Sequence, residues 1–200
     1  MAHLPLTLVH RQKYIQDQLD ESAATKKKMF ESCAGDILKA VDAIINGFNN
    51  RKKVLICGNG GSAADAQHIA TELVIRMSKT NRPALPAIAL TTDTSMLTAC
   101  GNDIGFENIF ARQVEALGAS GDVLIAISTS GKSENVNRAI KVAKQRGMTV
   151  VGFLGKDGGS SKDIVDIPII IPSNDTQRIQ EGHITVAHII CGIVENEMFG

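Results

Sequence analysis

From residue 52 onward, short apolar segments alternate with longer segments of helical periodicity, and this alternation constrains the fold more than any other feature. The apolar segments span residues 54–57, 87–90, 123–127, 149–154 and 167–171. Apolar residues at helical spacing occupy residues 63–77, 107–117, 134–145 and 176–198. Continuous apolar strands separated by helices are typical of a parallel sheet that is covered on both faces. We therefore predict an α/β fold, a three-layer sandwich with a five-stranded parallel sheet.

Residues 9–50 carry little strand signal, and their apolar residues recur at helical spacing. We predict two N-terminal helices here, with a break near Ala34-Gly35-Asp36, where Asp36 could cap the second helix. Both helices carry apolar stripes and precede the α/β unit, so they could pack against another subunit or cover their own domain. We expect residues 1–50 to serve oligomerisation and to belong to the same domain as residues 51–200.

Composition and charge exclude several classes of function. Lys and Arg total 21, as do Asp and Glu, and the chain has one Tyr and no Trp. Balanced charge gives no general attraction to nucleic acid or to an anionic membrane, and few aromatic side chains are present to stack on bases. The N-terminus lacks the pattern of a secretory leader, and no apolar run approaches the roughly 20 residues that span a bilayer. We expect a cytoplasmic protein without nucleic-acid or membrane partners.

The cysteines are scattered along the chain at Cys33, Cys57, Cys100 and Cys191. None forms a C-x-x-C pair, so the spacing of a zinc ribbon or of a thioredoxin site is absent from the sequence. Cys57 lies inside a predicted strand, where cysteine behaves as a small hydrophobic residue. We expect reduced thiols with a packing role.

Two strand-ending loops suit an anion. The loop Gly58-Asn59-Gly60-Gly61-Ser62 follows the first strand and opens a helix, where bare N–H groups and the helix dipole favour phosphate. The loop from Ser128 to Ser133 follows the third strand and offers the hydroxyl groups of Ser128, Ser130 and Ser133. Ligands of parallel α/β sheets bind at the carboxyl ends of the strands, so we predict a phosphate-binding cleft at these loops.

Two nucleotide-binding motifs compete for the same loops. The first loop, with Ala63, fits G-x-G-x-x-G/A, but Asp93 lies about 30 residues further on, where the ribose-binding acidic residue is expected at about 20. The second loop resembles a Walker A motif with Ala126 in place of the first glycine. The predicted strand runs through Ala126, and no later strand ends in an Asp that could hold magnesium. We therefore expect no nucleotide cofactor.

Histidine and carboxylate residues lie on two predicted helices. His68 and Glu72 are one turn apart after the first loop, so imidazole and carboxylate project side by side. Gln180 and His188 lie about 80° apart around the last helix and can share a face. Such groups beside a bound phosphate can move the protons of a phosphorylated metabolite. Spacing does not show whether the two pairs meet, and we interpret His183 as structural.

Together these motifs resemble the SIS (sugar isomerase) domain family, whose members bind phosphosugars. The resemblance covers nearly the whole chain and is carried by residues 57–68, Glu72-Leu73, residues 101–106, residues 127–133 and Arg178-Ile179-Gln180-Glu181. It implies phosphosugar contacts at Asn59, Gly60, Gly61, Ser62, Glu72, Asn102, Asp103, Ser128, Thr129, Ser130, Ser133 and Gln180. It implies one zinc ion per subunit, bound by His68, Glu72, Gln180 and His188.

The activity that the resemblance implies is an aldose–ketose isomerisation. Sedoheptulose 7-phosphate would become D-glycero-D-manno-heptose 7-phosphate through an enediol or enediolate, early in heptose synthesis for lipopolysaccharide or surface glycans. Glu72 would move the proton between neighbouring carbons, and His188 would open the ring or shuttle a hydroxyl proton. A zinc-bound carboxylate is a poorer base, so either Glu72 leaves the metal during turnover or the metal has another role.

The family also implies a homotetramer with sites near subunit interfaces. It includes non-catalytic phosphosugar sensors and adaptors of the replication-initiation type, which form the alternative function. The presence of His68, Glu72, Gln180 and His188 together favours the enzyme. Ile75 and Gln177 depart from the usual family pattern, and this departure bears on the substrate and not on the reaction class.

Overall fold

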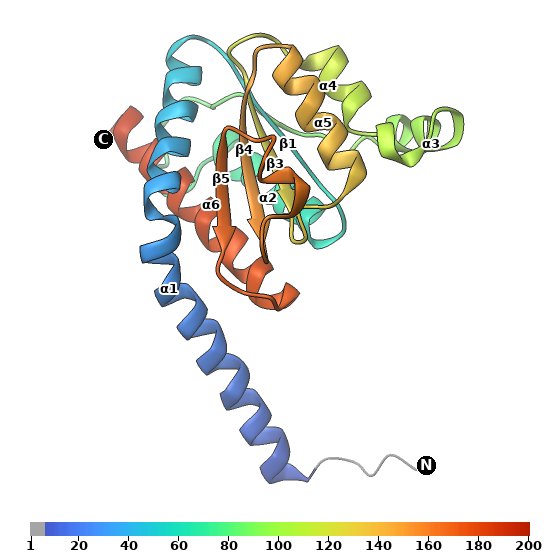
Figure 1. Ribbon diagram of the computed structural model, residues 1–200. Helices are drawn as coiled ribbons and strands as arrows, with labels where there is room; N and C mark the ends of the chain where they lie inside the picture. Colours follow the sequence, from blue (N-terminus) through green and yellow to red (C-terminus); the bar gives the residue numbers. More distant parts are fainter. Residues whose placement is uncertain (1–6) are drawn as a thin grey trace.

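The computed structural model describes residues 7–200. Residues 1–6 lie outside the described residues. They begin the predicted 1–50 segment, and the prediction of no secretory leader partly rests on them. The described chain forms a parallel five-stranded sheet in the order β2-β1-β3-β4-β5, the flavodoxin-like order (Figure 1). The predicted sheet is confirmed. Its strands are β1 (Val54–Gly58), β2 (Ala87–Ala89), β3 (Val123–Ser128), β4 (Thr149–Gly155) and β5 (Ile167–Ile171).

The helices pack on both faces of this sheet. They are α1 (Leu8–Asn49), α2 (Gly61–Val74), α3 (Thr94–Asp103), α4 (Ala111–Leu117), α5 (Glu134–Gln145) and α6 (Thr176–Phe199), with short 3-10 turns η1 (Phe106–Asn108) and η2 (Gly159–Ser161). Across residues 7–200, none of these helices has both the length and the apolar character needed to cross a bilayer.

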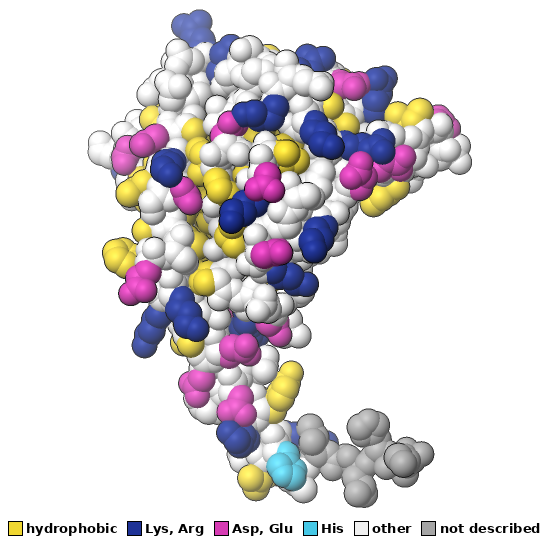
Figure 2. All heavy atoms as spheres, viewed as in Figure 1, with side chains coloured by type: hydrophobic (Ala, Val, Ile, Leu, Met, Phe, Trp, Pro, Cys, Tyr) yellow, Lys and Arg dark blue, Asp and Glu magenta, His cyan; other side chains and the backbone are white. Residues whose placement is uncertain are grey.

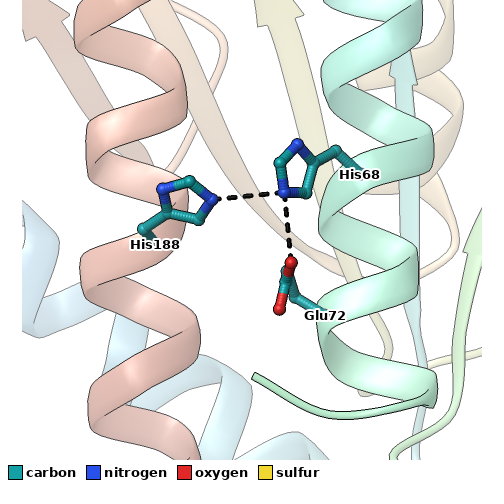
Figure 3. Close-up of side chains that lie close together, drawn as sticks. All are labelled: His68, Glu72 and His188. Atoms are coloured by element: carbon teal, nitrogen blue, oxygen red, sulfur yellow. Dashed lines mark hydrogen bonds and ion pairs between the residues drawn. The ribbon is translucent and has the colours of Figure 1, made fainter. Parts of the chain in front are cut away.

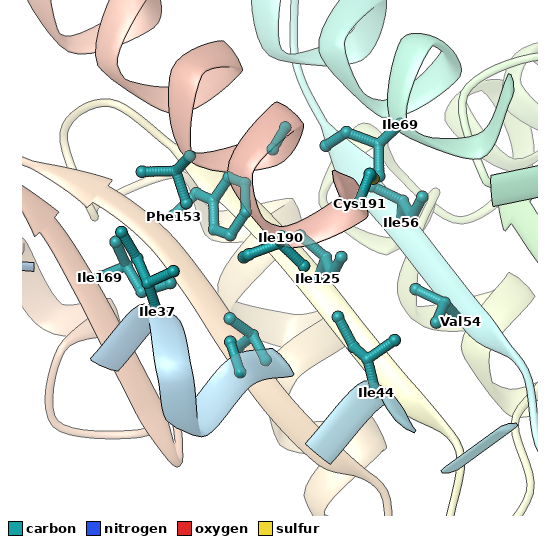
Figure 4. Packing of buried hydrophobic residues seen from close by; sticks show 14 of the residues in the cluster. Ile37, Ile44, Val54, Ile56, Ile69, Ile125, Phe153, Ile169, Ile190 and Cys191 are labelled. Atoms are coloured by element: carbon teal, nitrogen blue, oxygen red, sulfur yellow. The ribbon is translucent and has the colours of Figure 1, made fainter. Parts of the chain in front are cut away.

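Alternation along the strands divides the core between two layers. In β3, Ile125 joins the hydrophobic cluster formed with α1, α2 and α6, whereas Leu124 joins the cluster formed with α4 and α5. Figure 4 shows the first cluster, in which Ile44 of α1 and Ile190 of α6 lie over the sheet near Ile125. Every residue of β1 and β3 is buried, which explains why these strands read as continuous apolar runs. The three-layer prediction is confirmed.

The prediction of two N-terminal helices is wrong, because α1 is continuous through the expected break. A glycine inside a helix costs only about 1 kcal/mol relative to alanine, and a Cβ at Gly35 would meet no atom within 4 Å. Asp36 does not cap a helix; its Oδ1 accepts from Lys39 Nζ at 2.8 Å. Buried residues on both sides of the expected break, including Cys33 and Ile37, keep the helix packed on the core.

The first half of α1 projects from the body of the molecule (Figure 1). Burial on this helix begins at Thr25. Before that point, large apolar side chains on the projecting half are at least 58% exposed, namely Leu8, Val9, Tyr14, Ile15 and Leu19. Figure 2 shows yellow side chains on this projecting part, whereas charges of both signs are interspersed over the visible face of the body.

Helix boundaries differ from the prediction at two further places. Helix α3 was not predicted; it has no fully buried residue, and only Leu97 and Cys100 pack against the core, both half-buried. The predicted helix over residues 107–117 begins as η1 and becomes α-helical only at α4. The predicted helix over residues 63–77 ends at Val74, and the N–H of Met77 donates to Glu195 Oε1 instead of continuing the helix.

Candidate active site

Helices α2 and α6 bring three predicted residues together (Figure 3). His68 Nε2 lies 3.1 Å from Glu72 Oε1 on the same helix and 3.2 Å from His188 Nε2 on α6. One ligand atom from each residue lies within 4.8 Å of the others. The His68 side chain is 44% exposed and that of Glu72 is 20% exposed, so a small molecule can reach the cluster. The structure thus makes the long-range contact that sequence spacing left open.

The donor atoms of this cluster fit a metal ion. An imidazole nitrogen carries either a proton or a lone pair, so His68 Nε2 cannot donate to Glu72 while accepting from His188. Three ligand atoms that all lie within 4.8 Å of one another are instead suited to a cation. Zinc binds nitrogen and oxygen ligands at about 2.0–2.2 Å, which places ligand atoms of a tetrahedral site about 3.3 Å apart. The observed separations of 3.1 and 3.2 Å are close to this value.

Gln180 lies beside the first loop. A Cβ built on Gly61 would lie 2.3 Å from Gln180 Nε2, so a larger residue at position 61 would displace this amide from its observed place. Gln180 precedes His188 by about 12 Å along the axis of α6. This places its amide at the opening turn of α2, close to the predicted phosphate site. Its assignment as a fourth zinc ligand stays a prediction.

The first loop has the backbone of an anion site. Gly60 adopts φ +56°, a conformation that other residues rarely take. A Cβ on Gly58 would lie 2.8 Å from both the Cβ and the carbonyl oxygen of Ser62, so the tight turn also requires this glycine. Helix α2 starts at Gly61, and the N–H groups of Ser62 and Ala63 donate to the loop carbonyl oxygens of Asn59 and Gly60 at 2.9 and 3.0 Å. The attraction for an anion at this point therefore comes from the positive end of the α2 dipole. Ser62 itself is only 4% exposed. The main chain at this helix N-terminus can therefore bind phosphate.

The second loop forms a short cradle. Strand β3 includes Ala126, as expected from the argument against a Walker A motif, and ends at Ser128. The hydroxyl groups of Ser128 and Ser133 lie 3.1 Å apart, and Ser130 Oγ accepts from Lys132 N at 3.2 Å. Thr129 lies between these serines, half-buried. The loop therefore gathers several hydroxyl groups at the end of the strand.

A neighbouring loop holds this cradle in shape. Gly131 has φ +61°, and a Cβ there would lie 1.8 Å from the carbonyl oxygen of Gly158. The carbonyl oxygen of Gly131 accepts from both the N–H and the hydroxyl of Ser161, at 2.9 and 3.0 Å. The hydroxyl-bearing loop after β3 is thus fixed by the loop after β4.

Asn135 is a residue of this region that the sequence reasoning missed. Its side chain is buried and forms a reciprocal pair of hydrogen bonds with the Asn59 side chain. The pair links the two candidate phosphate loops. Its position just after the second loop, at the start of α5, was the only available signal in the sequence.

Asn102 and Asp103 end α3, which projects from the body (Figure 1). Both are exposed, and Asn102 Nδ2 donates to Asp103 Oδ1 at 2.7 Å. Their predicted contact with a phosphosugar stays a prediction.

His183 has the surroundings of a structural residue. It is 1% exposed, and its Nε2–H donates to the carbonyl oxygen of Leu154 at 2.9 Å. Burial lowers the pKa of His183 to about 4, so the ring is neutral near pH 7. This agrees with the interpretation made from the sequence and separates His183 from His188 on the same helix.

Comparison with known proteins places the chain in a family. A model described as the SIS domain matches residues 18–155. The chain belongs to the SIS domain family. It is 55% identical over 189 residues to the phosphoheptose isomerase of Trichlorobacter lovleyi. The aligned region covers 94% of this chain and 96% of that protein.

Two solved structures of SIS-family relatives resemble this one closely. Phosphoheptose isomerase GmhA from Neisseria gonorrhoeae superposes with a TM-score of 0.87 at 41% identity, covering 92% of this chain and 98% of that chain. A phosphoheptose isomerase from Francisella tularensis gives a TM-score of 0.90 at 37% identity, covering 93% of this chain and 98% of that chain. The likeness extends over nearly the full length of each relative.

Proposed function

We propose that this chain is an enzyme that interconverts sedoheptulose 7-phosphate and D-glycero-D-manno-heptose 7-phosphate. The observation that carries the proposal is the meeting of His68, Glu72 and His188 between α2 and α6, in a chain whose relatives are phosphoheptose isomerases. The reaction would serve heptose synthesis for lipopolysaccharide or other surface glycans, in the cytoplasm.

The two loops would bind the substrate, and the cluster of His68, Glu72 and His188 would carry out the proton transfers. The first loop and the hydroxyl groups of the second would bind the phosphate and orient the sugar, with Gln180 beside them. Glu72 approaches His68 through Oε1, which leaves Oε2 to take the proton beside the carbonyl group and return it to the neighbouring carbon. His188 would move the hydroxyl proton. Proton transfer by each positioned group contributes about 10²–10⁴-fold.

We further propose one zinc ion per subunit, bound by His68, Glu72 and His188, with Gln180 as the fourth candidate ligand. The ligand separations described above support the first three of these residues, and Gln180 rests on the family resemblance. A zinc ion bound there supplies a Lewis acid for the carbonyl or enediolate oxygen.

We also propose a homotetramer built through residues 1–50. Within residues 7–200, each chain has two exposed apolar surfaces. One is the stripe on the projecting half of α1, and the other is a groove between α1 and α6. Phe30, Leu38 and Ile189 on this groove are 80%, 57% and 41% exposed. Exposed apolar patches of this extent mark interaction surfaces, and an identical subunit offers a complementary one.

The test of the function is an isomerisation assay on the purified chain and on two variants, Glu72→Gln and His188→Gln. Each variant should lower kcat by about 10²–10⁴-fold, because each replaces a proton-transfer group with an amide of similar size. Glu115→Gln, on the exposed surface of α4, is the control and should keep the wild-type rate. Turnover unchanged in either site variant would contradict the mechanism. Phosphosugar binding by a wild-type chain without turnover would support the sensor or adaptor alternative.

A further inference from the structure

A buried carboxylate connects the C-terminal part of α6 with the segment that follows α2. Glu195 is 1% exposed, and both of its oxygens accept hydrogen bonds. Oε1 accepts from Met77 N at 2.9 Å and from Arg82 Nε at 2.7 Å. Oε2 accepts from Ser78 N, Ser78 Oγ and Lys79 N at 2.8, 2.7 and 3.0 Å. One side chain of α6 thus organises the first turn of chain beyond α2.

Arg82 extends this connection to α2 itself. Its side chain is 2% exposed, and its three nitrogens have separate partners. Nε donates to Glu195, one terminal nitrogen donates to the carbonyl oxygen of Pro83 at 2.8 Å, and the other donates to the carbonyl oxygen of Glu72 at 2.6 Å. The guanidinium therefore spans from α6 to the peptide group of a cluster residue.

The charge of Glu195 makes this connection sensitive to the loss of either partner. Burial alone would raise its pKa, but hydrogen bonds from Arg82, Met77 and Ser78 outweigh burial and hold the pKa well below its usual range. Glu195 is therefore ionised at neutral pH. Removing one member of a buried ion pair is strongly destabilising, because the other charge stays buried without compensation.

We propose that Glu195 and Arg82 are positioning residues that set the placement of α2 against α6, and with it the separations among His68, Glu72 and His188. Glu195 lies about two turns beyond His188 on the same side of α6. The cluster connects α6 to α2 directly, and the ion pair connects them again through the bond from Arg82 to the Glu72 carbonyl oxygen. Displacing reacting groups by about 1 Å can cost about 100-fold in rate. The effect on catalysis rests on the proposed function, whereas the effect on geometry does not.

Arg82→Lys and Glu195→Gln test this role. Lysine keeps a positive charge beside Glu195, but a single ammonium cannot replace the guanidinium that reaches both Glu195 and the Glu72 carbonyl. Glutamine keeps the size and one acceptor of Glu195 but removes its charge. If the glutamine variant does not fold, the lysine variant still gives a result.

Asp122→Asn is the matched control for loss of a buried carboxylate. The Asp122 side chain is 2% exposed and accepts from Lys53 Nζ at 2.6 Å, Lys53 N at 3.0 Å and Ala119 N at 2.8 Å. It precedes β3, at the amino end of the sheet, whereas the candidate loops follow the carboxyl ends. Its loss should destabilise the protein without moving the cluster.

We expect Arg82→Lys and Glu195→Gln to lower kcat about 10-fold or more, with KM changed less than about 2-fold, because the phosphate loops keep their own contacts. Zinc affinity, measured by competition with a chromophoric chelator, should fall about 10–100-fold, as for other residues that orient metal ligands. A crystal structure of either variant should show a changed separation between His68 Nε2 and His188 Nε2. Asp122→Asn should lower the thermal midpoint only.

In the wild type, His68 Nε2 and His188 Nε2 lie 3.2 Å apart. The proposal is overturned if Arg82→Lys and Glu195→Gln both keep this separation and the wild-type kcat while their thermal midpoints fall as in Asp122→Asn. An inactive wild type would refute the proposed function instead. The variant crystal structures would still decide the positioning role in that case.

Discussion

The side chains of Asn59 and Asn135 donate hydrogen bonds to each other, at 2.9 and 2.8 Å. Asn59 lies in the loop after β1, and Asn135 lies in the first turn of α5, after β3. Asn135 Oδ1 also accepts from Val136 N at 2.9 Å, which fixes the orientation of its amide group. The pair therefore joins the two candidate phosphate loops where the strand order reverses, which is where ligands of such sheets bind.

Asn135→Leu should weaken substrate binding, because it leaves the Asn59 amide without its partner and free to turn away from the substrate. An unsatisfied buried polar group costs about 1–3 kcal/mol, so we expect KM to rise about 10-fold in steady-state kinetics, with a smaller change in kcat. Asn50→Leu, which removes an exposed amide contact with Asn46 at the end of α1, should leave KM unchanged. Equal KM values for the two variants would argue against a role for the pair.

Metal binding should depend on His68. We expect one zinc per subunit in the wild type and none in His68→Ala, measured by elemental analysis after dialysis. A ligand that binds the folded chain in preference to the unfolded chain stabilises it, so chelation should lower the thermal midpoint of the wild type but not that of His68→Ala. His10→Ala, which removes an exposed histidine on α1, should bind zinc as the wild type does. A full equivalent of zinc in His68→Ala would refute this ligand set.

Assembly should depend on the apolar face of the projecting half of α1. Leu19→Glu places a charge where a 62% exposed leucine would be buried between the subunits of the proposed tetramer, so we expect light scattering to show a smaller particle for this variant than for the wild type. Gln16→Glu adds the same charge to an exposed residue of that helix and should give a particle of the wild-type size. A wild type that is monomeric at micromolar concentration would exclude the assembly.

His183 should make stability depend on pH. Its pKa is lowered to about 4 in the folded chain from an ordinary value of 6.5, so between these values the unfolded chain binds a proton that the folded chain does not. The stability contributed by the neutral ring is therefore complete above pH 6.5 and is lost as the pH falls toward 4, by on the order of 3 kcal/mol. Denaturant unfolding should show the advantage of wild type over His183→Gln shrinking across this range. A constant difference would contradict this account.

Cys100 should be the thiol that reacts first in the native protein. Cys33, Cys57 and Cys191 are buried, and burial raises the pKa of Cys57 and of Cys191 to about 12, whereas Cys100 is partly exposed. A chromogenic disulfide reagent should therefore modify about one thiol per chain before unfolding, and Cys100→Ser should remove that fast phase. Rapid modification of several thiols in the native state would contradict the observed burial.

Strands β1, β3 and β4 could be predicted because nearly all of their residues are buried, and the expected strand at residues 167–171 coincides with β5. The continuity of α1 through Gly35 could not be predicted from local signals, because it depends on the packing of the helix on the core, which outweighs the small penalty of one glycine. Helix α3 gave little signal because it has no fully buried residue.

The site was predictable only within single elements. One turn of helix places His68 beside Glu72 whatever the tertiary fold, and the structure shows that pair at 3.1 Å. The contact with His188 depends on how α6 packs against α2, and no local pattern encodes it. Asn135 was missed for the same reason, since its partner lies 76 residues away in the sequence.

The contact between His68 and His188 joins residues 120 positions apart, and the sheet itself is entirely parallel. During synthesis, α2 leaves the ribosome long before α6 exists, so a nascent chain has only one side of the cluster. Parallel strands and such distant contacts are slow to form, because the chain loses the entropy of loop closure before the stabilising contacts are made. The cluster can therefore form only after α6 has been made and has packed against α2, so its appearance would report that these two distant parts of the chain have come together.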